Sequence, residues 1–375
     1  MPGCHPSHLA RFVAAGALAV LVSGLTACAA DRGAPTDAPV SAPPAPAEPA
    51  ELAVPDAPVR LQLTTYDGSG QTVHPDFAAP LAPWQRRLFY LAVTPYPNGE
   101  SRHENPSLFV SGNGVGWTAA PHAPAPLVRP RAGYLSDPDL VHASARNELF
   151  LYYREVADSD EIQLARSHDG ASWDNGALLF RAPRNAALSP AVVRRAADDW
   201  MMYTVNGFTG CNDRAARLEL RRSTDGLHWS SPQALDVGAP SLLSPWHVDV
   251  QWVETRHEYW ALYPAKAPGG CATTALFLAT SPDGVRWRTL PSPVLTAGTV
   301  PALADIVYRS TLAYDPAADQ VTLWISGATL ERGAFVWSTV VLKRPRAALF
   351  SEALRALRMP IRAASRLVQA QFTPP

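Results

Sequence analysis

Side chains suited to acid–base chemistry recur in five short patches along this chain of 375 residues. Each patch places carboxyl, imidazole, guanidinium, hydroxyl or aromatic groups at the start of a run of strand-forming residues. The five patches are His74–Phe77, Ser136–Val141, Leu188–Val193, Trp246–Trp252 and Tyr308–Leu312. Polar groups on core-directed strands are costly unless they line a solvated space, so we expect the patches to converge at one end of a common axis.

The spacing inside the patches favours a shared polar surface. Asp137 and Asp139 are two residues apart, so they lie on the same side of a strand. Asp249 follows His247 by the same interval. Arg309, in the fifth patch, indicates either a partner for a carboxylate inside the site or a contact to an anionic substrate.

A repeated turn marks the strands that must position these groups. The turn has the pattern Ser-x-Asp/Asn-Gly-x-x-Trp, and its four copies are Ser111–Trp117, Ser167–Trp173, Ser223–Trp229 and Ser281–Trp287. Their tryptophans are 56, 56 and 58 residues apart, which is typical of β-propeller blades. Asp-Gly after an alternating run predicts a hairpin, and the tryptophan that follows can pack against the neighbouring blade. We assign these turns a structural role.

A fifth repeat lacks the turn but has three strand-like runs between Tyr308 and Leu342. The sequence therefore predicts an all-β fold, a five-bladed β-propeller over residues 59–342. The tail, 343–375, is basic and has apolar residues at helical spacing, which predicts an amphipathic helix. That helix would lie on an anionic surface or pack on the propeller.

The pattern of the N-terminal residues predicts an export signal. An apolar run at residues 12–22 follows basic residues, and Leu-Thr-Ala-Cys ends at Cys28. This pattern resembles a lipoprotein signal peptide of residues 1–28, with Cys28 as the lipid acceptor. Residues 29–58 are rich in proline and alanine, which predicts a semi-rigid tether. We expect a protein of the cell envelope, anchored by lipid in the outer membrane or at the cell surface.

Composition limits the partners. The formal net charge of −1 argues against a nucleic-acid binder. Cys211 and Cys271 occupy equivalent places in successive repeats of an exported chain, so we expect a disulfide between them. Two thiols without further ligands make a poor metal site. We predict no metal, no cofactor and a monomer.

The repeats, the inner strands with Asp-Pro and the Asp-Gly turns together resemble the five-bladed propeller glycoside hydrolases of the family 43 and family 32 type, over about residues 70–342. The resemblance implies that Asp76 is the general base and that Asp139 orients it. The general acid of that family is a glutamate of the third blade, where this chain has Ser189. A hydroxyl group cannot protonate a leaving group as a tuned carboxylic acid does, so the usual mechanism is in doubt.

Three other carboxyl groups are candidates for the acid. Asp249 beside His247 is the first choice, and Glu104 is the second, although Glu104 could instead bond a neighbouring loop; Asp137 is the third. The predicted substrate-binding residues are His74, Tyr96, Asp137, Ser189, Trp246, His247, Tyr308 and Arg309. The three aromatic residues among them could stack on sugar faces or pack in the core.

Two functions follow from this interpretation. The first is a membrane-anchored glycoside hydrolase that acts on extracellular or envelope polysaccharide by carboxylate acid–base catalysis. The second is a non-catalytic propeller that binds glycan or an envelope partner. In that case Ser189, in place of the glutamate acid, marks the loss of catalytic activity. A carbohydrate is the expected substrate or ligand in both.

Overall fold

The computed structural model describes residues 51–79, 88–143, 146–211, 216–267 and 269–350. The predicted signal peptide, Cys28, most of the tether and the tail beyond residue 350 lie outside these ranges. Among the described residues, no helix has the length and apolar character needed to cross a membrane.

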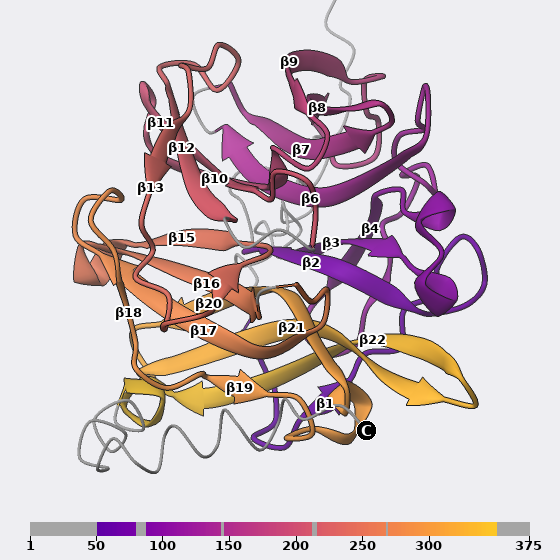
Figure 1. Ribbon diagram of the computed structural model, residues 1–375. Coiled ribbons are helices and arrows are strands. Elements are labelled where there is room, and N and C mark those ends of the chain that lie inside the picture. The colour runs from indigo at the N-terminus through magenta and orange to yellow at the C-terminus, as the bar shows by residue number, and fades with distance from the viewer. Residues whose placement is uncertain (1–50, 80–87, 144–145, 212–215, 268, 351–375) are drawn as a thin grey trace, which may run out of the picture. The chain divides into compact units, whose positions relative to one another are not determined.

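Five antiparallel sheets, which we call blades 1 to 5, surround a common axis (Figure 1). Blade 1 has β2 (Thr72–Ala78), β3 (Phe89–Pro95), β4 (Ser107–Ser111) and β5 (Thr118–Ala119). Blade 2 has β6 (Tyr134–Ala143), β7 (Glu148–Val156), β8 (Ser159–Ser167) and β9 (Ala177–Pro183). Blade 3 has β10 (Leu188–Ala196), β11 (Asp199–Asn206), β12 (Arg217–Ser223) and β13 (Gln233–Leu235).

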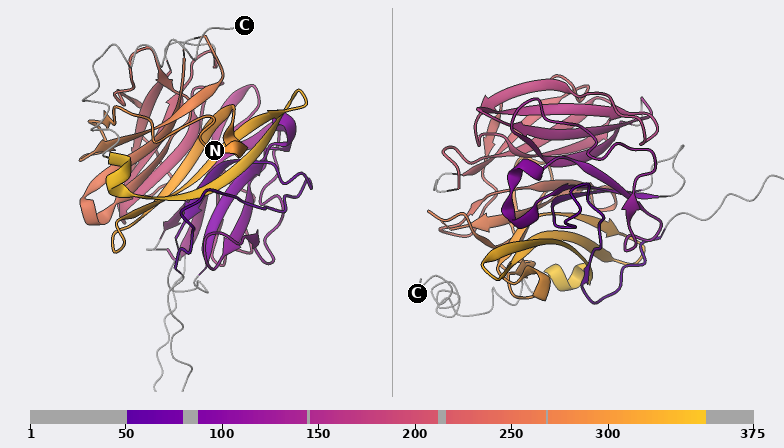
Figure 2. Two further views of the ribbon diagram at one scale, coloured as in Figure 1. Left: turned by 90° about the horizontal axis from the view of Figure 1, so that it is seen from below. Right: turned by 90° about the vertical axis from the view of Figure 1, so that its right-hand side faces the viewer.

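The last two blades depart from the four-strand pattern. Blade 4 has six strands: β14 (Ser244–Pro245), β15 (Asp249–Val253), β16 (Glu258–Lys266), β17 (Thr273–Ser281), β18 (Arg288–Thr289) and β19 (Leu295–Thr296). Blade 5 has β20 (Ile306–Asp315), β21 (Gln320–Glu331) and β22 (Ala334–Pro345), and its outer strand is β1 (Val59–Arg60) from the other end of the propeller sequence. This pairing closes the ring, so blade 1 and blade 5 lie side by side (Figure 2). The predicted five-bladed propeller is confirmed.

The apolar core lies between the blades. Each of five large clusters of buried side chains joins two neighbouring sheets, such as Leu188 and Tyr203 of blade 3 with Val248 and Tyr259 of blade 4. Because the sheets pack face to face around the axis, the innermost strands β2, β6, β10, β15 and β20 are left facing the centre.

The predicted turns connect the third and fourth strands of blades 1 to 4. In blade 2, Ser167 Oγ accepts the N–H of Gly170 at 2.8 Å. Asp169 Oδ1 accepts the N–H groups of Ala171 and Ser172 at 2.8 and 2.7 Å. The same bonds recur in the other three turns. The turns therefore build the blades, as predicted.

The tryptophan of the turn packs on the preceding blade in two cases. Tyr152 of blade 2 donates to the carbonyl oxygen of Gly226 at 2.8 Å, and its ring lies 6.1 Å from that of Trp229. Tyr203 of blade 3 makes the matching contacts to Gly284 and Trp287. These contacts join neighbouring blades.

The inner strands of blades 1, 2, 3 and 5 each contain a one-residue bulge near the start. In β2 the pairing skips one residue between Val73 and Asp76, and the same shift occurs in β6, β10 and β20. In blade 4 the extra residue falls in the gap between β14 and β15. Bulges bend a strand and re-aim its side chains, and they are common beside active sites.

The ends of the propeller differ from the predicted boundaries. Val54, within the predicted tether, is 2% exposed and packs with Leu61 and Trp117, so the folded part begins before Val59. At the other end, β22 continues to Pro345, and residues 346–350 form a helical turn. The rest of the predicted C-terminal helix lies outside the described residues.

The predicted disulfide is present. Cys211, in the link between β11 and β12, is bonded to Cys271, in the link between β16 and β17. These are equivalent loops of blades 3 and 4, as the repeat spacing predicts.

Candidate active site

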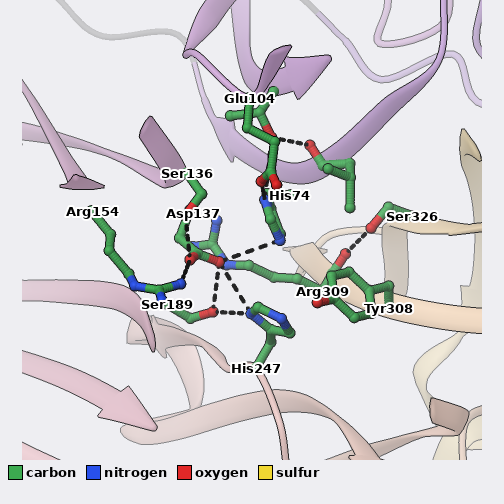
Figure 3. Close-up of polar contacts among 12 residues, drawn as sticks. His74, Glu104, Ser136, Asp137, Arg154, Ser189, His247, Tyr308, Arg309 and Ser326 are labelled. Carbon is green, nitrogen blue, oxygen red and sulfur yellow. Dashed lines mark hydrogen bonds and ion pairs between the residues drawn. The ribbon is translucent and has the colours of Figure 1, made fainter. Parts of the chain in front are cut away.

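Two layers of polar side chains occupy the starts of the inner strands. The first layer consists of His74, Asp137, Ser189 and His247 from blades 1 to 4 (Figure 3). The second layer follows two residues later along the same strands and consists of Asp76, Asp139 and Asp249, with Thr311 from blade 5. All eight side chains are buried.

The backbone is strained at the first layer. His74, Asp137 and Ser189 have φ values of 55°, 54° and 52°, although each precedes a proline and none is a glycine. A left-handed conformation of this kind costs about 1–3 kcal/mol and persists where the surrounding structure enforces it. Here the inner-strand bulges enforce it, because they fall at these three residues.

Asp137 is the centre of the first layer. Its Oδ1 accepts a hydrogen bond from Ser189 Oγ at 3.0 Å and lies 3.1 Å from His247 Nδ1 and 3.4 Å from His74 Nε2. Ser189 Oγ is also 2.5 Å from His247 Nδ1. One carboxylate oxygen therefore joins side chains from four blades.

The other oxygen of Asp137 faces Arg154 on β7. Asp137 Oδ2 accepts from Ser136 Oγ at 3.0 Å and from Arg154 Nη1 at 3.3 Å. Burial alone would raise the pKa of Asp137, but the neighbouring imidazoles and Arg154 outweigh it and hold that pKa well below its usual range. Asp137 is therefore ionised at neutral pH.

Glu104 supports His74 from the opposite side. It follows the short helix η2 (Ser101–His103), and its Oε2 lies 3.2 Å from His74 Nδ1. Burial and the charge of Asp137 raise the pKa of Glu104 well above its usual value. Burial lowers the pKa of both His74 and His247. The sequence left open whether Glu104 reaches the site, and the structure places it there.

Aromatic rings border the first layer. The ring of Tyr308 lies 4.3 Å from that of His247, and Trp246 Nε1 donates to the Tyr308 hydroxyl at 3.2 Å. Trp337 lies 5.3 Å from Tyr308 and 4.9 Å from Tyr96. Tyr308 and Tyr96 are half-buried, so they are the aromatic residues of the group nearest to solvent.

The second layer braces the propeller. Asp76 Oδ2 accepts the N–H of Leu140 in blade 2 at 2.7 Å, and Asp139 Oδ2 accepts the N–H of Val192 in blade 3 at 3.0 Å. Burial and the charge of Asp249 raise the pKa of Asp76 to about 8. A carboxyl group in this state is a poor base at neutral pH, so the base role of Asp76 stays a prediction that these contacts do not favour.

Arg309 is fully buried and reaches across the axis from blade 5. Its guanidinium donates to the carbonyl oxygens of Pro138 at 2.6 Å, Val248 at 3.4 Å and Pro190 at 3.5 Å, and lies 3.7 Å from Asp139 Oδ1. Of the two roles proposed from the sequence, these contacts favour the partner of an internal carboxylate.

Two features escaped the sequence analysis. Arg154 interrupts the apolar run of β7, which is a signal that could have identified it. His74, Asp137 and His247 also bring one possible ligand atom each within 4.8 Å of one another, as do the three aspartates of the second layer. The prediction of no metal rests on the two cysteines alone and does not take either cluster into account.

No protein-family model matches this chain. The chain is 28% identical over 297 residues to the A type blood N-acetyl-alpha-D-galactosamine deacetylase of Flavonifractor plautii. The alignment covers 66% of this chain but 38% of that protein, so the chain spans well under half of the length of this relative.

Solved structures define the class of fold. An N-acetylgalactosamine deacetylase from F. plautii, in complex with blood group B trisaccharide, matches with a TM-score of 0.69 and 23% identity, over 79% of this chain and 97% of that chain. A thermostable family-43 glycoside hydrolase matches with a TM-score of 0.53 and 12% identity, over 72% of this chain and 88% of that chain. The chain therefore has the five-bladed propeller fold found in these carbohydrate-active enzymes, which confirms the resemblance at the level of fold.

Proposed function

We propose that this chain hydrolyses the acetyl amide of an N-acetylated sugar in a glycan. The observation that carries the proposal is the first layer, where two imidazoles and one ionised carboxylate meet with their ligand atoms within 4.8 Å. The Nε2 atoms of His74 and His247 are buried without hydrogen-bond partners. The similarity to a sugar deacetylase supports the choice of bond.

This donor set suits a cation of the zinc or manganese class. Two nitrogens and one carboxylate oxygen are typical of catalytic sites that keep a position open for substrate. When bound, such a cation would polarise the amide carbonyl and increase the acidity of water. His74, Asp137 and His247 are the residues that would hold it, because one possible ligand atom from each lies within 4.8 Å of the others and neither Nε2 atom makes a hydrogen bond.

The surrounding residues orient these ligands. Thr94 Oγ1 and Glu104 Oε2 each lie 3.2 Å from His74 Nδ1, so the ring is held with Nε2 facing Asp137, which is the arrangement common around metal-binding histidines. Arg154 and Ser136 occupy Asp137 Oδ2, leaving Oδ1 to face the imidazoles. Burial and the charge of Asp137 raise the pKa of Glu104, which favours its protonated form and makes Glu104 the candidate to deliver a proton to a leaving amine.

Tyr308 is the proposed donor to the developing oxyanion. Its hydroxyl oxygen accepts from Trp246, so its own proton is available, and burial raises its pKa well above the usual value. Removal of one such donor reduces kcat by roughly 10²–10³. We therefore expect Tyr308→Phe to lose turnover by that factor with little change in substrate binding.

Hydrolysis of a glycosidic bond is the second candidate, and the raised pKa of Glu104 favours it because a protonated carboxyl can act as the general acid. The base of this mechanism is harder to supply. Asp76 lies in the second layer, where its Oδ2 is bound to Leu140 and its pKa is raised. The geometry therefore supports amide hydrolysis better.

The test is a parallel assay of purified chain on N-acetylated oligosaccharides and on aryl glycosides, with and without EDTA and with Zn²⁺ or Mn²⁺ restored. We expect acetate release that EDTA abolishes. His247→Ala should lose it, while His142→Gln, a matched change on β6 outside both layers, should keep it.

Cleavage of aryl glycosides that is insensitive to EDTA would replace this proposal by the glycosidase alternative. Saturable glycan binding with no product of either kind would instead establish a binding module.

A further inference from the structure

The second layer contains buried oxygen atoms that the propeller itself does not satisfy. Asp76 and Asp139 each use Oδ2 to accept a backbone N–H, and Asp249 uses Oδ2 to accept from Gln251 at 3.3 Å. Of the three remaining oxygens, Asp76 Oδ1 and Asp249 Oδ1 have no hydrogen-bond partner, and Asp139 Oδ1 lies 3.7 Å from the Arg309 guanidinium. Buried polar atoms in native proteins almost always have one, so each orphan needs an explanation.

Thr311 is an independent observation at the same place. It belongs to blade 5, is completely buried and faces the carboxyl of Asp249, yet its Oγ1 lacks a hydrogen bond of normal geometry. A valine would fill the same space without an unsatisfied hydroxyl. Three blades thus bring carboxylate oxygens together, and a fourth adds the Thr311 hydroxyl beside Asp249.

The charges in this layer do not balance. Asp76, Asp139 and Asp249 bring three carboxyl groups together, and one oxygen from each lies within 4.8 Å of the others. Arg309 is the cation described beside them, and its guanidinium already donates to three backbone carbonyl oxygens. Carboxylates buried this closely repel one another unless protons or a further cation offset their charge.

We propose that the second layer is a binding site for a hard divalent cation of the calcium class, held by one oxygen each from Asp76, Asp139, Asp249 and Thr311. Calcium takes oxygen ligands at about 2.3–2.6 Å, so ligand atoms on opposite sides of the ion are about 4.8 Å apart. The spread of the three carboxylate oxygens fits within that diameter.

This site differs in chemistry from the first layer. The second layer offers oxygen atoms alone, whereas the first layer offers two imidazoles, which suit zinc or manganese. Because the second layer joins four inner strands, the ion would stabilise the ring. The two sites can therefore be lost separately.

The experiment uses the purified chain, freed of metal by chelation and then titrated with Ca²⁺. Bound metal is measured by elemental analysis and stability by thermal unfolding. We expect one tightly held Ca²⁺ per chain and a higher Tm in Ca²⁺ than in EGTA. Asp249→Asn should abolish the bound calcium, and Thr311→Val should weaken its affinity by about 10–100-fold.

Matched variants separate this proposal from others. Thr322→Val, a buried threonine on the adjacent strand β21, should leave calcium affinity unchanged. His247→Ala should keep the calcium and its stabilising effect while losing acetyl hydrolysis, so failure of the proposed function would leave this result intact.

The proposal is overturned if the chelated chain takes up no calcium and its Tm is unaffected. It is equally overturned if Thr311→Val is as stable as the parent with unaltered calcium response, because the hydroxyl would then face only water or protonated carboxyl groups.

Discussion

The guanidinium of Arg309 donates to the carbonyl oxygens of Pro138, Pro190 and Val248, which belong to blades 2, 3 and 4. In blades 2 and 4 these carbonyls lie between the first-layer and second-layer residues, and in blade 3 the carbonyl follows the first-layer residue Ser189. Arg309 is also fully buried, so its charge depends on these bonds and on Asp139. One side chain therefore fixes both layers relative to each other.

We predict that Arg309→Met destabilises the chain by about 3–5 kcal/mol, because it leaves a buried carboxylate and three carbonyl groups without their partner. The free energy of unfolding, measured in urea, checks this. Arg286→Met is the control, since that arginine is 82% exposed in its side chain and its ion pair with Asp283 should contribute less than about 1 kcal/mol. Equal losses in the two variants would refute the central role of Arg309.

At the scale of the strand and turn, the local sequence predicts where the turns lie but does not predict the bulges. The Asp-Gly turns end the third strands where expected, because the serine and aspartate side chains satisfy the turn without help from elsewhere. The bulges at His74, Asp137 and Ser189 depend on pairing with the second strands. They also need a positive φ at these residues, which the proline that follows each of them does not predict. The patches were thus identified, but their division into two layers was not.

The turn of blade 3 gives a sharp test of packing between blades. Gly226 has a φ of 74°, and a Cβ placed there would lie 2.8 Å from Tyr152 Oη and 3.1 Å from Trp200. Gly68 has a φ of 78° with nothing within 4 Å. Both changes to alanine pay about 1–2 kcal/mol for the left-handed backbone.

We therefore predict that Gly226→Ala costs about 1–3 kcal/mol more than Gly68→Ala, because of overpacking. Urea denaturation of the two variants measures the difference. Indistinguishable unfolding free energies would mean that Tyr152 moves away at no cost.

The turn aspartates also predict how stability depends on pH. Backbone N–H donors lower the pKa of Asp169 and Asp283, and at Asp225 they outweigh the opposing effect of burial. Stability from a carboxyl whose folded pKa is lowered is present above the unfolded value of about 3.9 and is lost as pH falls through the folded value.

We expect the triple change of these aspartates to asparagine to reduce the loss of Tm below about pH 4. Asn113, which occupies the same position in blade 1 and accepts the same two N–H groups, shows that asparagine fits the turn. An unchanged acid transition would show that other groups control it.

For the whole molecule, the repeat period and the fifth run of strands predict the blade count and, through it, the Cys211–Cys271 pair. The closure of the ring was not predicted, because β1 has two residues and its pairing with β22 depends on contact between distant ends of the sequence. Arg154 escaped notice for a related reason. It enters the site from a second strand, beside inner strands whose place at the axis appears only when the blades assemble.

Attachment to a membrane is a proposal that rests on the sequence of the N-terminus. We propose that Cys28 is lipidated and that this holds the propeller at the cell envelope. Cys28→Ser should leave soluble or unprocessed chain on fractionation, since the lipid acceptor is gone. If the variant still partitions wholly with membranes, another segment is the anchor.

The central claim is that this chain hydrolyses an acetyl amide and not a glycosidic bond, and it is tested by identifying which bond is broken. An oligosaccharide ending in N-acetylgalactosamine, with ¹³C at the acetyl carbonyl, can be followed by NMR in the presence of the chain and Zn²⁺ or Mn²⁺. The account predicts that the carbonyl signal moves to that of free acetate while the glycosidic linkage stays intact, and that His247→Ala prevents the change. Release of a free sugar that still carries its labelled acetyl group would contradict it.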